Sequence, residues 1–103
     1  MASGIDQSII DTAKEYVQAL RKNNVSFESV WLFGSSVRGQ INEESDIDIA
    51  IVMKEVSERF FKELELLKYR RKIDSRIEPH ILTTEELNSP LSYEIKETGM
   101  KIA

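Results

Sequence analysis

The chain has 103 residues, enough for one domain around a modest hydrophobic core, so we expect a single domain over residues 1–103. Hydrophobic residues make up 41% and charged residues 31%, proportions that exclude intrinsic disorder. The net charge of −4 argues against nucleic acid as the main partner, and the absence of cysteine excludes disulfides and thiol chemistry.

Helical periodicity opens the chain. At residues 6–23, apolar side chains recur at spacings of three and four, which predicts an amphipathic helix with one buried stripe. Ser3 and Asp6 offer a capping pair at its start. Residues 29–33 follow as a short apolar, aromatic and β-branched run, a pattern typical of a strand covered on both faces.

The middle of the chain predicts a turn, a loop and a second strand. The first strand ends abruptly at Gly34, after which we expect one helical turn at 35–39 and a polar loop at 40–45. Residues 46–52 then alternate strictly: Ile47, Ile49 and Ile51 point to one side, and Asp46 and Asp48 point to the other. This pattern predicts a strand with a core face and an acidic start.

A second helix and a third strand are predicted next. Residues 55–71 have helical periodicity, with Ser57 as the candidate N-cap. Phe61 lies beside an apolar stripe that is formed by Val56, Phe60, Leu64 and Leu67. The third strand is expected at 75–82, where apolar residues alternate with polar ones.

Short helical segments are expected at the end of the chain. Thr83 and Glu86 match a capping box that starts a helical turn. Pro90 is placed to open a last helix through Thr98, and Gly99 is placed to close it. The order of elements predicts a sheet of about three strands beneath helices.

A glycine–serine corner follows the first strand. Gly34 lets the backbone approach a ligand closely, and the amides that open the next turn are donors that suit a phosphate. Ser35 adds a hydroxyl, and Arg38 adds a fixed positive charge that would steer a triphosphate. A plain turn and a solvated arginine would give the same pattern, so the corner alone is a weak signal.

Two aspartates stand two residues apart at the start of the second strand. Asp46 and Asp48 therefore share a face, and without a cation their carboxylates would repel each other. Hard oxygen ligands with no histidine or cysteine nearby favour Mg²⁺ or Mn²⁺ over zinc. The alternative is a pair of solvated acids, but aspartate is disfavoured in strands, and such local conflicts are expected at functional sites.

Glu78 offers a third carboxylate in the third predicted strand. If this strand pairs with the second, Glu78 joins the two aspartates on one face, and three carboxylates can hold two divalent ions. Asp74 has the same strand parity and is the competing candidate, although it lies nearer the preceding helix. Taken alone, Glu78 is an ordinary exposed glutamate. His80 shares its face and is interpreted as structural, with a nucleotide contact as the alternative.

Together these motifs resemble the signature of the DNA polymerase β-like nucleotidyltransferase superfamily. The resemblance rests on Gly34-Ser35 and, after ten residues, Asp46-Ile47-Asp48. Longer stretches are similar to its smallest branch, the minimal nucleotidyltransferase (MNT) domains: residues 34–39, 45–52, 76–80 and 95–99. The resemblance therefore extends over nearly the whole chain.

This resemblance implies a small α/β (α+β) domain with a mixed sheet, which transfers a nucleoside monophosphate from an NTP to an acceptor hydroxyl. Gly34 and Ser35 would hold the β- and γ-phosphates. Asp46 and Asp48 would ligate two Mg²⁺ ions, or Mn²⁺, and Glu78 would ligate the catalytic ion and help to deprotonate the acceptor. Many relatives place an aspartate where this chain has Glu78, which leaves the geometry of the catalytic metal open.

The expected partners follow from the size of the chain and from the resemblance. A metal and triphosphate site leaves little chain for an acceptor pocket, so a second copy or another polypeptide must supply one. The resemblance points to a HEPN-type helical toxin, for which MNT proteins act as antitoxins, some by adding AMP from ATP to a tyrosine of the toxin. Two alternatives stay open: an inactive antitoxin that neutralises its partner by binding, and a transferase for small molecules such as aminoglycosides.

The remaining features have more ordinary interpretations. Trp31 and Phe33 are interpreted as core residues, because they lie in an apolar strand. The basic run at residues 68–72 complements the dipole of a helix end, with a contact to RNA or to an acidic partner as the alternative. No apolar run approaches the ~18 residues of a membrane span, and residues 1–11 lack a signal-peptide pattern. We therefore expect no membrane partner and a cytoplasmic location.

Overall fold

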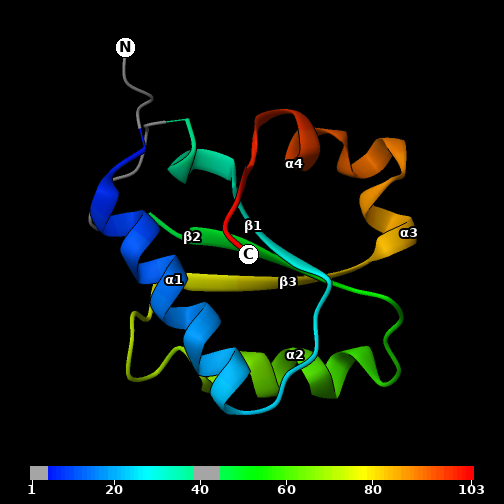
Figure 1. The fold of residues 1–103 in the computed structure, drawn as a ribbon, viewed down its shortest axis with the longest axis horizontal. Helices are drawn as coiled ribbons and strands as arrows, with labels where there is room; N and C mark the ends of the chain where they lie inside the picture. The colour runs from blue at the N-terminus through cyan, green and yellow to red at the C-terminus, as the bar shows by residue number, and fades with distance from the viewer. Residues whose placement is uncertain (1–4, 39–44) are drawn as a thin grey trace.

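The computed structural model describes residues 5–38 and 45–103 of the chain. A mixed β-sheet forms the central layer, with helices packed on both of its faces (Figure 1). The expected α/β (α+β) class, a small mixed sheet flanked by helices, is confirmed. Among the described residues, no helix is both long enough and apolar enough to cross a membrane.

The sheet contains four strands: β1 (Ser29–Phe33), β2 (Ile47–Met53), β3 (Ile77–Thr83) and β4 (Met100–Lys101). Their order across the sheet is β3-β2-β1-β4. β1 is antiparallel to both of its neighbours, whereas β3 runs parallel to β2. The pairing of β3 with β2, on which the third carboxylate depends, is therefore present.

The short strand β4 was not predicted. It pairs with Trp31 and Leu32 of β1 over two residues, too few for an alternating pattern to be visible in the sequence. The chain can enter β4 because Gly99 has no side chain. A Cβ at Gly99 would collide with the backbone carbonyl oxygens of Ile95 and Leu32.

Helix α1 (Gln7–Lys22) confirms the predicted amphipathic helix. Asp6 is its N-cap, and its carboxylate accepts a bond from the Ser8 amide at 2.9 Å, which lowers the pKa of Asp6. Ser3 lies outside the described residues. The buried stripe of the helix consists of Ile9, Ala13, Tyr16, Val17 and Leu20.

Helix α2 (Arg59–Lys68) is shorter than the predicted helix at 55–71. Its N-cap is Glu58 and not Ser57, and no side chain caps this end. Glu58 has a φ of 51°, in the left-handed region, so the residues before it cannot continue the right-handed helix.

The predicted apolar stripe of α2 is not its buried face. Phe60 is 66% exposed, Phe61 65% and Leu64 45%, whereas Leu66, on the other side of the helix, is fully buried. A stripe of this kind would ordinarily face the core. In this fold it faces outward.

Two arginines explain this orientation of α2. β3 is an edge strand, so part of its backbone lacks a strand partner. Arg59 donates to the carbonyl oxygen of Ile81 at 2.6 Å, and Arg70 donates to that of Ile77 at 2.7 Å. Arg59 begins α2 and Arg70 lies in the turn that follows it, so both ends of the helix are tied to β3 in an orientation that leaves the aromatic side outside.

Three short segments precede β4: α3 (Thr84–Leu87), the 3₁₀ turn η2 (Pro90–Ser92) and α4 (Tyr93–Thr98). The predicted capping box is confirmed, since the Thr83 hydroxyl accepts from the Glu86 amide and the Glu86 carboxylate accepts from the Thr83 amide. The last helix is split into η2 and α4 and ends at Gly99, as expected.

The hydrophobic core has one part on each face of the sheet. The larger part contains the buried stripe of α1, Leu66 of α2 and alternate residues of the strands. The smaller part, under α3 and α4, contains Ala50, Val52, Leu87 and Ile95. Trp31 and Phe33 pack against this smaller part while remaining half-buried, which confirms their interpretation as core residues.

We predict that acid weakens the fold partly through Glu86. Its bonds to the Thr83 amide and to Arg59 hold the pKa of this carboxyl below its ordinary value of 4.5. The bonds contribute stability above the ordinary pKa, and the contribution is lost as the pH falls through the lowered one. Glu86→Gln should therefore flatten the fall in the free energy of unfolding below about pH 4.5, measured by urea denaturation.

The matched control is Glu85→Gln, because Glu85 is exposed on the same helical turn and makes no such bonds with the described residues. An equal flattening in both variants would contradict the role assigned to Glu86.

Candidate active site

The glycine–serine corner lies directly against Asp48. Gly34–Ser36 form a 3₁₀ turn, η1, immediately after β1, and Gly34 has a φ of +78°. A Cβ at Gly34 would lie 2.5 Å from Oδ2 of Asp48, so only glycine permits this approach. The hydroxyl of the buried Ser36 donates to the carbonyl oxygen of Phe33 at 3.1 Å, which holds the turn in place.

The remaining residues of the predicted turn and loop are only partly described. Ser35 is half-buried in η1, and Arg38 follows the turn on the surface. Residues 39–44, which include the end of the predicted turn and most of the predicted loop, lie outside the described residues.

The strict alternation predicted around the two aspartates is confirmed. Ile47, Ile49 and Ile51 are fully buried in the larger core. Asp48 therefore points to the opposite face, where it is only partly exposed, and Asp46 is exposed just before β2 begins. Burial of the isoleucines thus determines which face the Asp48 carboxylate occupies.

Glu78 lies directly opposite Asp48 in the parallel ladder between β2 and β3. Paired residues of neighbouring strands share a face, so both side chains lie on the same side of the sheet. His80, two residues further along β3, has its Nε2 3.1 Å from Oδ1 of Asp48. Its ring lies edge-on to Phe33, with the ring centroids 5.2 Å apart.

The two candidates for the third carboxylate have different partners. Glu78 is 3.3 Å from the guanidinium of Arg70, in a partly buried ion pair. Both carboxylate oxygens of Asp74 accept from Arg76, at 3.0 and 2.8 Å, and these bonds lower the pKa of Asp74. Asp74 is thus held in the turn before β3, and Glu78 faces Asp48.

The chemistry of the predicted metal ligands suits a hard divalent cation, but the ligands are not gathered. Among the described residues, no three side chains of histidine, aspartate or glutamate are clustered closely enough to hold a metal ion. Glu78 bonds to Arg70, and Asp48 bonds to His80. The three carboxylates of the prediction therefore lie at adjacent positions without forming a closed ligand set.

Arg38 lies beside α4. Its guanidinium donates to Glu94 at 2.8 Å, and both side chains are about half exposed. An exposed pair of this kind contributes ~0–1 kcal/mol, so it does not hold Arg38 firmly. The backbone amide of Arg38 donates to the carbonyl oxygen of Ser35 at 3.2 Å, which keeps Arg38 next to the corner, whereas its side chain bonds to Glu94.

Two residues at this site were not predicted to belong to it. Arg70 was interpreted with its basic neighbours as a complement to the helix dipole, yet it bonds to Glu78. Phe33 was interpreted as a core residue, yet its ring also contacts the ring of His80. No sequence signal indicates either contact, because each depends on the packing of distant segments.

Comparison with known proteins identifies the family. A model of the nucleotidyltransferase domain matches residues 10–102. Two candidate protein adenylyltransferases of Methanocaldococcus jannaschii are 37% identical to this chain. One match spans 70 residues, 67% of this chain and 69% of the relative, and the other spans 90 residues, 84% and 89%. The chain therefore belongs to the nucleotidyltransferase family.

Solved structures support the same fold. A candidate nucleotidyltransferase from Sulfolobus solfataricus is 25% identical, with a TM-score of 0.65 over 91% of this chain and 78% of that chain. A toxin–antitoxin complex with AMP-PNP is 23% identical, with a TM-score of 0.67 over 87% and 71%. A tri-AMPylated HEPN toxin of Shewanella oneidensis with its MNT antitoxin gives 20% identity and a TM-score of 0.60 over 89% and 69%.

We predict that Gly34→Ala destabilises the protein. Alanine in the left-handed region costs about 1–2 kcal/mol, and its Cβ would also displace the Asp48 carboxylate. Urea denaturation should show a lower midpoint with an unchanged slope. Ser26→Ala, in an exposed loop, is the control and should unfold as the wild type does. An unchanged midpoint for Gly34→Ala would contradict the close contact with Asp48.

Proposed function

We propose that this protein is an antitoxin that transfers AMP from ATP to a tyrosine hydroxyl of a HEPN-type partner. The main structural support is the contact of Gly34 with Asp48, with Glu78 opposite on the neighbouring strand. This arrangement places a close backbone corner beside carboxylates, as phosphoryl transfer from a metal-bound triphosphate needs. The candidate adenylyltransferases among its relatives and the fold shared with toxin–antitoxin complexes support the proposal.

In this proposal each predicted site residue has one role. Gly34 and Ser35 hold the β- and γ-phosphates, and Arg38 contributes charge to the triphosphate. Asp46, Asp48 and Glu78 hold two Mg²⁺ ions, for which Mn²⁺ can substitute. When bound, these cations supply neutralisation of the triphosphate charge and activation of the attacking oxygen.

Glu78 accepts the proton of the acceptor hydroxyl. A bond forms between the acceptor oxygen and the α-phosphorus, the bond from that phosphorus to the bridging oxygen breaks, and pyrophosphate leaves with the electron pair. For this role Glu78 must turn away from Arg70. The ion pair between them is partly exposed and 3.3 Å long, so it opposes this movement only modestly.

One observation favours a second candidate function, an antitoxin that neutralises its partner by binding alone. The carboxylates of the described residues are not clustered for a metal ion, and Glu78 is paired with Arg70. A site held in this form would keep the family fold without transferring a nucleotide. No described feature favours a small-molecule acceptor.

We predict that Asp48→Asn abolishes transfer. The purified protein is incubated with labelled ATP, Mg²⁺ and a co-expressed HEPN-type toxin, and label on the toxin is measured. Asparagine keeps the size of the side chain but removes the charge that would hold the cation. Asp11→Asn, the same change on the outer side of α1, should leave labelling intact.

Growth of cells that express the toxin distinguishes the two candidate functions. Under the transfer proposal, Asp48→Asn fails to protect these cells, whereas Asp11→Asn protects them. If Asp48→Asn binds the toxin and protects as well as the wild type, neutralisation occurs by binding and the transfer proposal is wrong.

A further inference from the structure

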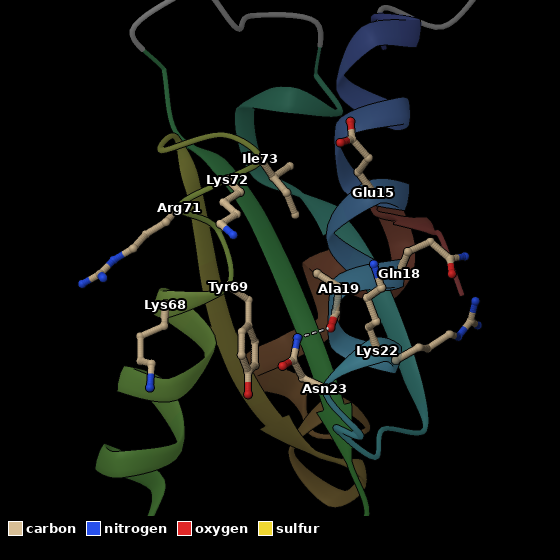
Figure 2. A pocket seen from close by; sticks show the side chains of 11 residues that line it. Glu15, Gln18, Ala19, Lys22, Asn23, Lys68, Tyr69, Arg71, Lys72 and Ile73 are labelled. Carbon is tan, nitrogen blue, oxygen red and sulfur yellow. Dashed lines mark hydrogen bonds between the residues drawn. The ribbon is translucent and has the colours of Figure 1, made fainter.

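A basic groove lies between the C-terminal parts of α1 and α2 (Figure 2). Its volume is about 870 Å³, and the half-buried Tyr69 and Ile73 contribute to its wall. Glu15 is the one acidic residue among those that line it. Its cationic lining residues, all exposed, are Arg21, Lys22, Lys68, Arg71 and Lys72.

None of these five cations forms an ion pair with a described residue. Arg21 lies over the ring of Phe27, and the other four make no described side-chain contact of this kind. Outside the groove, five of the nine lysine and arginine side chains are paired with an acid: Arg38, Arg59, Lys62, Arg70 and Arg76. The chain thus concentrates unpaired positive charge at one place although its net charge is −4.

The helix dipoles do not account for this charge. Each helix C-terminus carries roughly half a negative charge, so the ends of α1 and α2 together offset about one cation. Five cations less Glu15 leave a formal charge of about +4 before this correction and about +3 after it. This surplus makes the groove complementary to an anionic partner.

The outer face of α2 continues from the groove as an apolar surface. Phe60, Phe61 and Leu64 are exposed on this face, and the two phenylalanine rings pack edge-to-face, 5.5 Å apart. Further along the helix, Leu64 lines a second hollow of about 610 Å³ together with Lys68 and Arg71, which also line the basic groove. In Figure 2 the side chain of Arg71 extends away from α1.

We propose that the groove and the outer face of α2 form one docking surface for an acidic amphipathic helix of a protein partner. Apolar side chains of that helix would pack on Phe60, Phe61 and Leu64, and its acidic side chains would pair with Lys68 and Arg71. The net charge of −4 repels a long polyanion, so a protein segment fits better than RNA.

This inference goes beyond the proposed transferase activity and does not depend on it. The groove opens on the face of the sheet that α1 and α2 cover, where Ile77 and Ile81 contribute to the larger core. Asp48 and Glu78 alternate with such core residues and lie on the other face. A variant that inactivates the site should therefore leave the docking surface intact.

Fluorescence anisotropy tests the proposal with a labelled synthetic peptide that has leucines on one helical face and glutamates on the other. The wild-type chain should bind this peptide, and Lys68→Glu/Arg71→Glu should bind it at least about tenfold more weakly. Phe60→Ser/Leu64→Ser should also weaken binding. The matched control is Lys54→Glu/Lys101→Glu, which makes the same change in charge at exposed lysines outside the groove and should bind as the wild type does.

The other outcomes overturn the proposal. Absence of peptide binding, or an equal loss in the control double variant, would show that there is no specific surface. Tighter binding of a single-stranded oligouridylate, lost in Lys68→Glu/Arg71→Glu, would make the groove a nucleic-acid site. Circular dichroism shows whether each variant is folded. Asp48→Asn should bind the peptide as the wild type does, whether or not the wild-type protein transfers AMP.

Discussion

The parallel pairing of β2 with β3 is the constraint on which the candidate site depends. It places Glu78 opposite Asp48, and it orients both residues by burying the alternate residues Ile47 and Ile77 in the core. A register shift of one residue would move either carboxylate to the opposite face. The Gly34 corner can approach Asp48 only because β1 runs antiparallel to β2 and ends beside its beginning. The site is thus assembled by strand pairing, and its side chains come from three separate segments.

The edge of the same sheet determines how α2 lies. Arg59 and Arg70 bond to carbonyl oxygens of the edge strand β3, and this turns the aromatic face of α2 outward. Arg70 also bonds to Glu78, so one side chain connects the end of α2 with the candidate site. The outward orientation of the apolar face of α2 and the bond between Arg70 and Glu78 thus both go with the hydrogen bonds that these arginines donate to the open side of β3.

Local patterns were sufficient where neighbouring residues alone decide the structure. The capping box of Thr83 and Glu86, the buried stripe of α1 and the alternation at the start of β2 were all predicted and are present. The start of α2 was placed too early, because the left-handed conformation of Glu58 leaves no mark in the amino-acid pattern. The outward stripe of α2 and the two-residue strand β4 were missed for a related reason, since both depend on contacts with distant parts of the chain.

The sequence by itself determined the family and the class of fold, and it indicated the residues of the candidate site, because motif spacing and hydrophobic periodicity are local properties. The tertiary structure alone decided which partners those residues have: Gly34 against Asp48, Glu78 beside Arg70, and Asp74 held by Arg76. It also decided that the phenylalanines of α2 face solvent and that unpaired cations gather between α1 and α2. These outcomes follow from packing and hydrogen bonding between segments far apart in the chain, and such contacts are not encoded in any single stretch of residues.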